Sequence, residues 1–317
     1  VLVLLHVPKF FLGYSLDSFT NIIRFSSVLV ALFYLRVGFR EIFILLTSLL
    51  LLNFCVSLML VADLEIGRVI SSVLNVKSLD LTYGRVSGLF YNVGVSSYFC
   101  YISCIYFFCS FLFDFRRKIS VIMAIIAFSS LVLAQSKTGL VLLIPSLVFL
   151  YFYIRKISVS NFLKISFALV VLSTLLSYYF EAIASSFYFV SKLSSIIASG
   201  EASSLSARFD LWIGYLSLQV NSLSAMLFGL DKAVMASVSN TFDSDFIWIL
   251  VNFGVLGLIV YLVMLLSLFR RATDPSAKIF KICCLFSIPF SFLIGVICQP
   301  QAALIFWMFF VNVRRTN

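Results

Sequence analysis

The side chains that could do chemistry in this chain lie at the ends of long apolar runs. Three are cations, Arg85, Lys137 and Arg208, and two carboxylates, Asp243 and Asp245, come directly before another apolar run. An arginine binds a phosphate group through two parallel hydrogen bonds, whereas a lysine binds it as a point charge. A carboxylate can accept the proton of a hydroxyl. These residue types predict a site for a diphosphate with a proton acceptor nearby.

Arg208 has aromatic neighbours on the helix that the sequence predicts over residues 205–220. Trp212 and Tyr215 follow it at spacings of four and seven, so all three side chains share one helical face. An arginine beside two aromatic rings at a membrane surface suits the binding of an anion.

Each of these residues also has a purely structural interpretation. A single Arg or Lys at the end of a span can be an interfacial anchor whose charge reaches the lipid headgroups. Asp243 can be a helix N-cap, and Asp245 can simply favour the helix dipole. Both interpretations stay open on the sequence alone.

The sequence lacks the residues that a histidine-based metal site, a catalytic triad or a nucleotide-binding P-loop would need. His6 is the single histidine, so a histidine-based metal site or a Ser/His/Asp triad is not expected. The segment Ser136-Lys137-Thr138-Gly139 lacks the glycine-rich lead of a P-loop. All seven cysteines lie in apolar runs without zinc spacing and are predicted to be packing residues. We therefore expect neither a metal nor an organic cofactor.

The elements that must position these residues are membrane helices. Of the 317 residues, 62% are apolar and 11% are charged, and the mean hydropathy is +1.12. Soluble domains carry about 25% charged residues, and a soluble fold of this size could not bury so much apolar surface. Because a span takes about 20 residues, the sequence predicts an all-α polytopic integral membrane protein with about nine to ten transmembrane helices.

The apolar runs give the approximate positions of these helices. They predict one membrane-embedded domain over 1–317, and because the chain opens inside an apolar run at Val1, we expect N-terminal helices to be missing from it. The connection 63–87 is an outer loop, and 181–244 is a large outer loop with amphipathic helices. The predicted spans are 1–12, 19–35, 42–62, 88–113, 119–134, 139–154, 165–180, 245–269, 279–298 and 302–313, with a turn at Gln299-Pro300-Gln301 between the last two.

The cations set the orientation of these spans. Dense runs at Arg116-Arg117-Lys118, Arg155-Lys156 and Arg270-Arg271 predict inner connections. The inner side then holds 14 cations and three acids, against nine cations and ten acids outside. This bias explains the net charge of +10 without nucleic-acid binding. The candidate site residues fall outside, so the expected ligand is a lipid-linked diphosphate at the outer leaflet.

Four stretches in one order carry a family resemblance. They are Arg85–Asn92, Gln135–Leu140, Ser206–Trp212 with Leu227–Gly229, and Ser244–Phe246 with Gly254 and Gly257. In this order they resemble the O-antigen polymerase (Wzy) family, within the wider O-antigen ligase and polymerase superfamily. The family's first motif has the form Arg-x-Ser-Gly-Leu-Phe-x-x-Pro-Asn and its second Ser-Arg-x-Gly. The chain departs from them by lacking the proline after Tyr91 and by having Lys137 in place of the arginine.

This resemblance implies a GT-C-like glycosyltransferase that polymerises undecaprenyl-diphosphate-linked repeat units of an O-antigen, capsule or exopolysaccharide. The reaction would take place at the periplasmic face of the bacterial inner membrane. The expected partners are the lipid-linked donor and acceptor glycans and membrane lipids, with a chain-length regulator protein as a further candidate. Implied catalytic residues are Asp243, Asp245 and Arg208, and implied diphosphate or glycan ligands are Arg85, Lys137, Arg208, Trp212 and Tyr215.

Two other functions stay open. An O-antigen ligase typically has a histidine in the long outer loop or just before the next helix, and 181–257 contains none. A transporter or flippase for the same lipid-linked glycan tends to carry charges within its spans. Here nearly all the charges lie at span ends, which favours a surface site.

Overall fold

The structure is a computed structural model. The single domain predicted from the sequence consists of two compact units, and most residue contacts lie within one unit or the other. The N-terminal unit is Leu45–Ala202, and the C-terminal unit is Ser203–Asn317 with the chain up to Ile44. The predicted spans 1–12, 19–35 and 165–180, and the loop residues 181–202 and 232–243, lie outside the described residues. Those described are 38–62, 64–66, 69, 79–80, 85–90, 92–155, 203–231, 244–269, 274–293 and 295–315.

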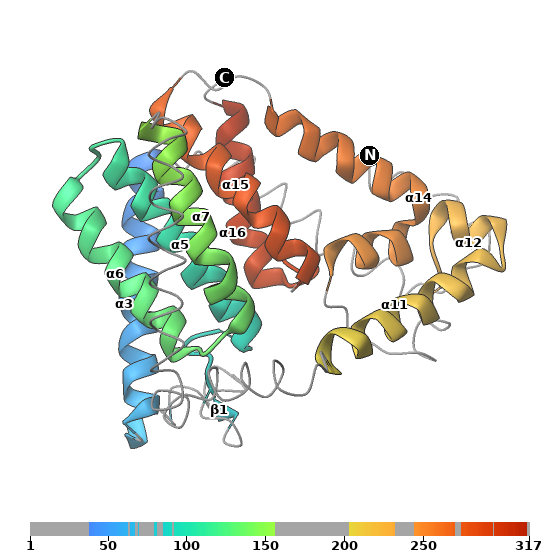
Figure 1. Ribbon diagram of the computed structural model, residues 1–317, viewed down its shortest axis with the longest axis horizontal. Helices are drawn as coiled ribbons and strands as arrows, with labels where there is room; N and C mark the ends of the chain where they lie inside the picture. Colours follow the sequence, from blue (N-terminus) through green and yellow to red (C-terminus); the bar gives the residue numbers. More distant parts are fainter. Residues whose placement is uncertain are drawn as a thin grey trace, which may run out of the picture. The chain divides into compact units, whose positions relative to one another are not determined.

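The N-terminal unit is built around one buried helix (Figure 1). Its described elements are most of α3 (Phe39–Val61), β1 (Leu79–Asp80), β2 (Arg85–Val86), α5 (Val93–Leu112), α6 (Arg117–Leu133) and α7 (Lys137–Arg155). α5 packs against both α6 and α7, and every residue from 95 to 107 is buried. The Tyr101 hydroxyl shares a 3.0 Å hydrogen bond with Ser146 of α7, so a polar pair links the two helices inside this apolar bundle.

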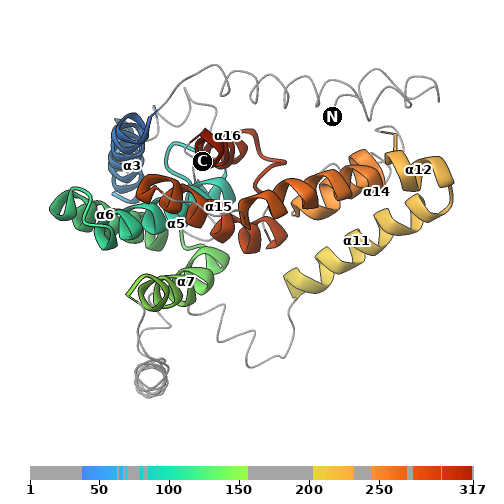
Figure 2. The same ribbon diagram turned by 90° about the horizontal axis from the view of Figure 1, so that it is seen from above.

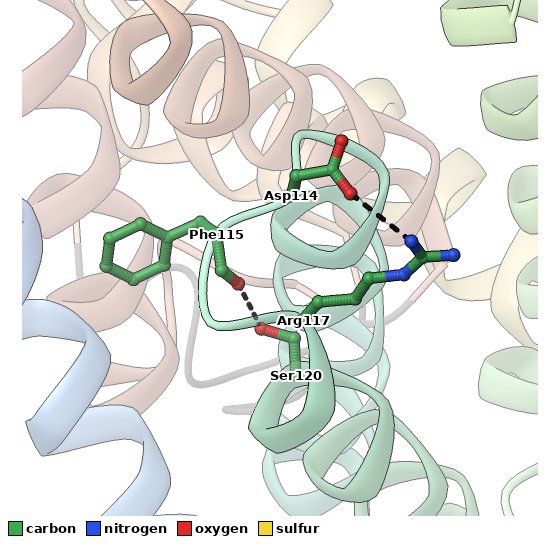
Figure 3. A network of polar contacts seen from close by, with 4 residues as sticks. All are labelled: Asp114, Phe115, Arg117 and Ser120. Atoms are coloured by element: carbon green, nitrogen blue, oxygen red, sulfur yellow. Dashed lines mark hydrogen bonds and ion pairs between the residues drawn. The ribbon is translucent and has the colours of Figure 1, made fainter.

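A tight turn joins α5 to α6. Asp114 and Arg116 both have positive φ, at 59° and 43°, a region that most residues avoid. Ser120 Oγ donates to the Phe115 carbonyl at 2.8 Å, and Arg117 makes an exposed 3.8 Å ion pair with Asp114 (Figure 3). The hydrogen bond of Ser120 ties the start of α6 to the backbone of this cationic turn.

The C-terminal unit contains the remaining described helices. They are α11 (Ser203–Val220), α12 (Leu223–Phe228), α14 (Asp245–Leu266), the short 3-10 helix η2 (Ser267–Phe269), α15 (Pro275–Leu293) and α16 (Pro300–Arg315). α15 packs on α16, and α12 packs on α14. Figures 1 and 2 both show α12 beside the bend of α14.

That bend divides α14 into two arms. Gly254 has φ 69° and ψ −169°, outside the helical region, and the ring centroids of Phe246 and Tyr261 are 5.4 Å apart. In a straight helix their positions would be separated by about 22 Å along the axis. The chain therefore folds back at Gly254, with one arm on either side of it.

Four described helices are long and apolar enough to cross a membrane. They are α3, α5, α14 and α15, and Thr138–Ile154 and Gln301–Val313 form shorter apolar helices. The chain is thus an α-helical membrane protein, as the composition predicts. The predicted spans 42–62, 119–134 and 139–154 match α3, α6 and α7 within three residues at each end.

The larger differences have local causes. α5 begins at Val93 rather than 88, because Asn92 caps it by accepting the Val95 N–H at 2.8 Å. α15 ends at Leu293 rather than 298, and residues 295–299 are not helical. Pro300 belongs to α16 rather than to the predicted turn, since a proline fits the first helical position well.

Candidate functional site

The backbone that carries Arg85 is held against α3. β2 pairs antiparallel with β1, with Arg85 opposite Asp80. Three residues on, Gly88 has φ +59°, and a Cβ there would overlap the Asn53 amide oxygen. Asn53 is fully buried, and the same oxygen accepts the Leu89 N–H at 3.0 Å. Only glycine fits this approach, and the segment before α5 is fixed by it.

α7 begins beside the start of α5. A Cβ on Gly139 would come within 2.5 Å of the Ser97 hydroxyl, so the first turns of the two helices are in close contact. Lys137 is the first residue of α7. The segments of Arg85 and Lys137 therefore lie at the same end of the N-terminal unit, while both side chains lie outside the described part of the structure.

The predicted aromatic face of α11 is largely a packing face. Tyr215 is 1% exposed and belongs to an apolar cluster with Ala225, Leu230 and Val251. The expectation of an open face is corrected at this residue, because α12 and α14 cover it.

Trp212 and Arg208 are the other two residues of this predicted face. Trp212 is half-buried and meets the exposed Phe209 ring edge-on at a centroid distance of 5.2 Å. Arg208 occupies the matching helical register in α11, and its side chain lies outside the described part.

α11 and the residues that follow α12 form hydrogen bonds to the backbone of α14 at its bend. The fold-back at Gly254 removes the helical donor of the Val251 carbonyl, and the Leu250 carbonyl lies next to it. Gln219 Nε2 donates to the Leu250 carbonyl at 2.7 Å, and the Leu230 N–H donates to the Val251 carbonyl at 2.7 Å. Both carbonyls are therefore satisfied inside an apolar unit, where an unpaired one is costly.

Two glycines permit this approach of backbone to backbone. Gly229 has φ +90°, and a Cβ there would come within 2.5 Å of the Val251 carbonyl oxygen. Gly254 has φ +69°, and a Cβ there would overlap the Leu227 carbonyl. The bend and its cover thus require glycine on both sides.

Asp245 is fully buried at the start of α14, and its carboxylate accepts three backbone N–H groups. Oδ2 accepts that of Val296 at 2.7 Å, and Oδ1 accepts those of Ile297 and Cys298 at 2.7 and 2.9 Å. Consecutive N–H groups of this kind form an anion-binding nest. The carboxylate occupies the nest and ties the start of α14 to the segment between α15 and α16.

These contacts suit a structural anchor better than a proton acceptor, because donors already occupy the carboxylate of Asp245. Ser244 holds the N-cap position of α14, so the alternative of Asp243 as the cap does not match the observed helix start. Asp243 itself lies outside the described residues.

Sequence reasoning did not single out Asn53 or Gln219. Asn53 is an amide within a strongly apolar helix, Gln219 is an amide between apolar residues near the end of α11, and a buried amide needs a specific partner. A single polar amide among apolar neighbours in the sequence is the signal that could have identified each of them. Their partners could not be predicted, because each lies more than 30 residues away along the chain.

No known protein helps to assign a function to these residues. Comparison of the chain with models of protein families, with curated proteins and with solved structures finds no match. Within the described ranges, no three His, Cys, Asp or Glu side chains gather as a metal site would need.

Proposed function

We propose that this chain is a membrane glycosyltransferase of the O-antigen polymerase kind. It joins undecaprenyl-diphosphate-linked oligosaccharide repeat units at the periplasmic face of the inner membrane. The observation that supports this best is the position of two segments, each with one cation, at the end of the N-terminal unit where α5 and α7 begin. The hydrogen bond from Leu89 to Asn53 holds the segment that follows Arg85, and the close approach of Gly139 to Ser97 places the start of α7 beside α5. Two cations at one end of a bundle suit a diphosphate.

In the proposed reaction, a hydroxyl of the acceptor sugar attacks C1 of the donor sugar. The bond from C1 to the diphosphate oxygen breaks, and its electron pair leaves with the diphosphate. Arg85, Lys137 and, by the family resemblance, Arg208 offset the charge that develops there. Asp243 takes the hydroxyl proton, while Asp245 holds α14 in place. The half-buried Trp212 offers a ring face for a sugar.

The test uses a strain that lacks the gene and is complemented with the full-length gene. Arg208→Ala should abolish long polysaccharide ladders, and Arg208→Lys should lose most of them, because lysine keeps the charge but not the planar fork. Immunoblotting of membranes gives the protein level of each variant. Normal ladders from Arg208→Ala would reject the role of this residue.

The same strain separates the alternative functions. A lost polymerase leaves lipopolysaccharide capped with a single repeat unit, whereas a lost ligase leaves none capped. A lost flippase leaves the lipid-linked repeat on the cytoplasmic side. Single-repeat capping in the deletion strain is the result that we expect.

A further inference from the structure

An apolar groove opens in the N-terminal unit between α5 and α6. Its volume is about 340 Å³, within the range of small-molecule sites. Phe108 and Phe111 of α5 line one wall, and Val121, Ile125 and Phe128 of α6 line the other. The groove follows α6 for about two turns, or roughly 10 Å. It offers room for a narrow hydrocarbon chain lying along the helix.

The α6 side of the groove is open to its surroundings. Ile125 is 59% exposed and Phe128 is 44% exposed. On a helix of a membrane protein, such side chains meet lipid tails rather than water. An occupant can therefore enter sideways from the bilayer.

One end of this groove carries positive charge. The Arg117 guanidinium carbon lies 5.1 Å from the centroid of the Phe111 ring, and that ring lines the groove. Arg116 and Lys118 flank Arg117, and all three side chains are exposed. Their acidic neighbour in the turn is Asp114, whose ion pair with Arg117 is exposed and therefore weak. The turn keeps a surplus of positive charge where the groove ends.

We propose that this groove binds an anionic phospholipid. One acyl chain lies between α5 and α6, and the phosphate lies at Arg117 and Lys118. The charge rule predicts this turn on the inner side, where anionic lipids attract basic segments. The site is separate from the proposed glycosyl transfer, and it depends only on the chain being a membrane protein.

The charge distinguishes this occupant from others. A neutral phospholipid would fill the groove equally well but would bring no net negative charge to the cationic turn. A second copy of the chain would have to bring an acidic group to the turn together with an apolar ridge. A phospholipid with an anionic headgroup supplies both parts in one molecule.

The test uses the full-length protein in neutral detergent. It is titrated with dioleoylphosphatidylglycerol or dioleoylphosphatidylcholine, and bound lipid is counted by native mass spectrometry. Phosphatidylglycerol should bind more tightly. Arg117→Gln should weaken it by about fivefold and leave phosphatidylcholine unchanged. Lys278→Gln removes an exposed cation of α15, and as the matched control it should change neither.

Two further variants probe each half of the site. Asp114→Asn frees Arg117 from its ion pair and should tighten phosphatidylglycerol binding by up to about fivefold. Asparagine tolerates the positive φ of this position, so the turn should keep its shape. Ala124→Phe places a ring in the groove and should weaken both lipids.

Several results would overturn the proposal. The two lipids could bind equally, or Lys278→Gln could weaken phosphatidylglycerol as much as Arg117→Gln does. Asp114→Asn could leave the affinity unchanged although the protein is folded. If Ala124→Phe converted a dimer into a monomer without altering lipid binding, the occupant would be a second copy of the chain.

Discussion

The side-chain amide of Gln219 donates to the backbone carbonyl of Leu250 at 2.7 Å. Leu250 lies four residues before Gly254, where α14 leaves the helical region. A side chain of α11 is therefore bonded to the backbone of α14 directly before the bend. The bend of α14 is therefore held by specific hydrogen bonds, and it requires glycine at Gly229 and Gly254.

Gly254→Ala should strongly destabilise the C-terminal unit. The substitution forces a side chain into a backbone conformation suited to glycine and against the Leu227 carbonyl. We expect a loss of about 3 kcal/mol or more, measured as a lower thermal midpoint in detergent. Gly214→Ala is the control, since Gly214 lies within α11 and alanine favours a helix. An unchanged midpoint in Gly254→Ala would contradict the fold-back.

Asp245→Asn should also lower stability. Whichever way the new amide turns, its NH2 group faces at least one backbone N–H that the carboxylate had accepted. We expect a loss of about 2–4 kcal/mol, read from the same thermal midpoint. Asp274→Asn serves as the control, because that exposed carboxylate accepts the Ser276 N–H and asparagine can replace it in that bond. Equal thermal midpoints for Asp245→Asn and Asp274→Asn would contradict the anchoring role of Asp245.

Asp243→Asn should abolish polymerisation without affecting the fold. An asparagine cannot take a proton from the acceptor hydroxyl, although it would replace an aspartate in a helix cap. Polysaccharide ladders in the complemented strain, compared with immunoblots of the protein, give the readout. Full-length ladders would remove Asp243 from the proposed mechanism.

Asn53→Leu should loosen the segment before α5. It leaves the partly buried N–H of Leu89 without its acceptor, which costs about 1–3 kcal/mol. We expect a lower thermal midpoint and shorter ladders, because the segment of Arg85 loses its frame. In the control Ser110→Ala, the lost bond runs within α5 to the Tyr106 carbonyl, and activity should persist. Ladders of normal length from Asn53→Leu would separate this contact from function.

The positions of the described apolar helices could be predicted to within five residues, because hydrophobicity largely decides them. The run that became α14 was predicted over 245–269, and α14 with η2 covers the same residues. Its bend was not predicted. Gly254 and Gly257 look alike in the sequence, and only Gly254 has positive φ among them. What decides between them is the backbone of Leu227, which comes from another part of the chain.

The candidate site could be predicted only at the level of residue type. Asp245 was recognised as a polar residue at the start of a span, but its three donors follow more than 50 residues later. Tyr215 shares a helical register with Trp212, and spacing cannot tell a covered face from an open one. Burial depends on α12, a helix of six residues that is too short to give a clear periodic signal.

The carboxylate of Asp245 has a consequence for how the chain is made. Its three donors are synthesised after the whole of α14 and α15, which at about 5–20 residues per second leaves a delay of some seconds. During that interval the carboxylate of Asp245 stands next to a strongly apolar segment. Until residues 296–298 are made, the carboxylate of Asp245 therefore lacks the three backbone N–H groups that it accepts in the folded chain.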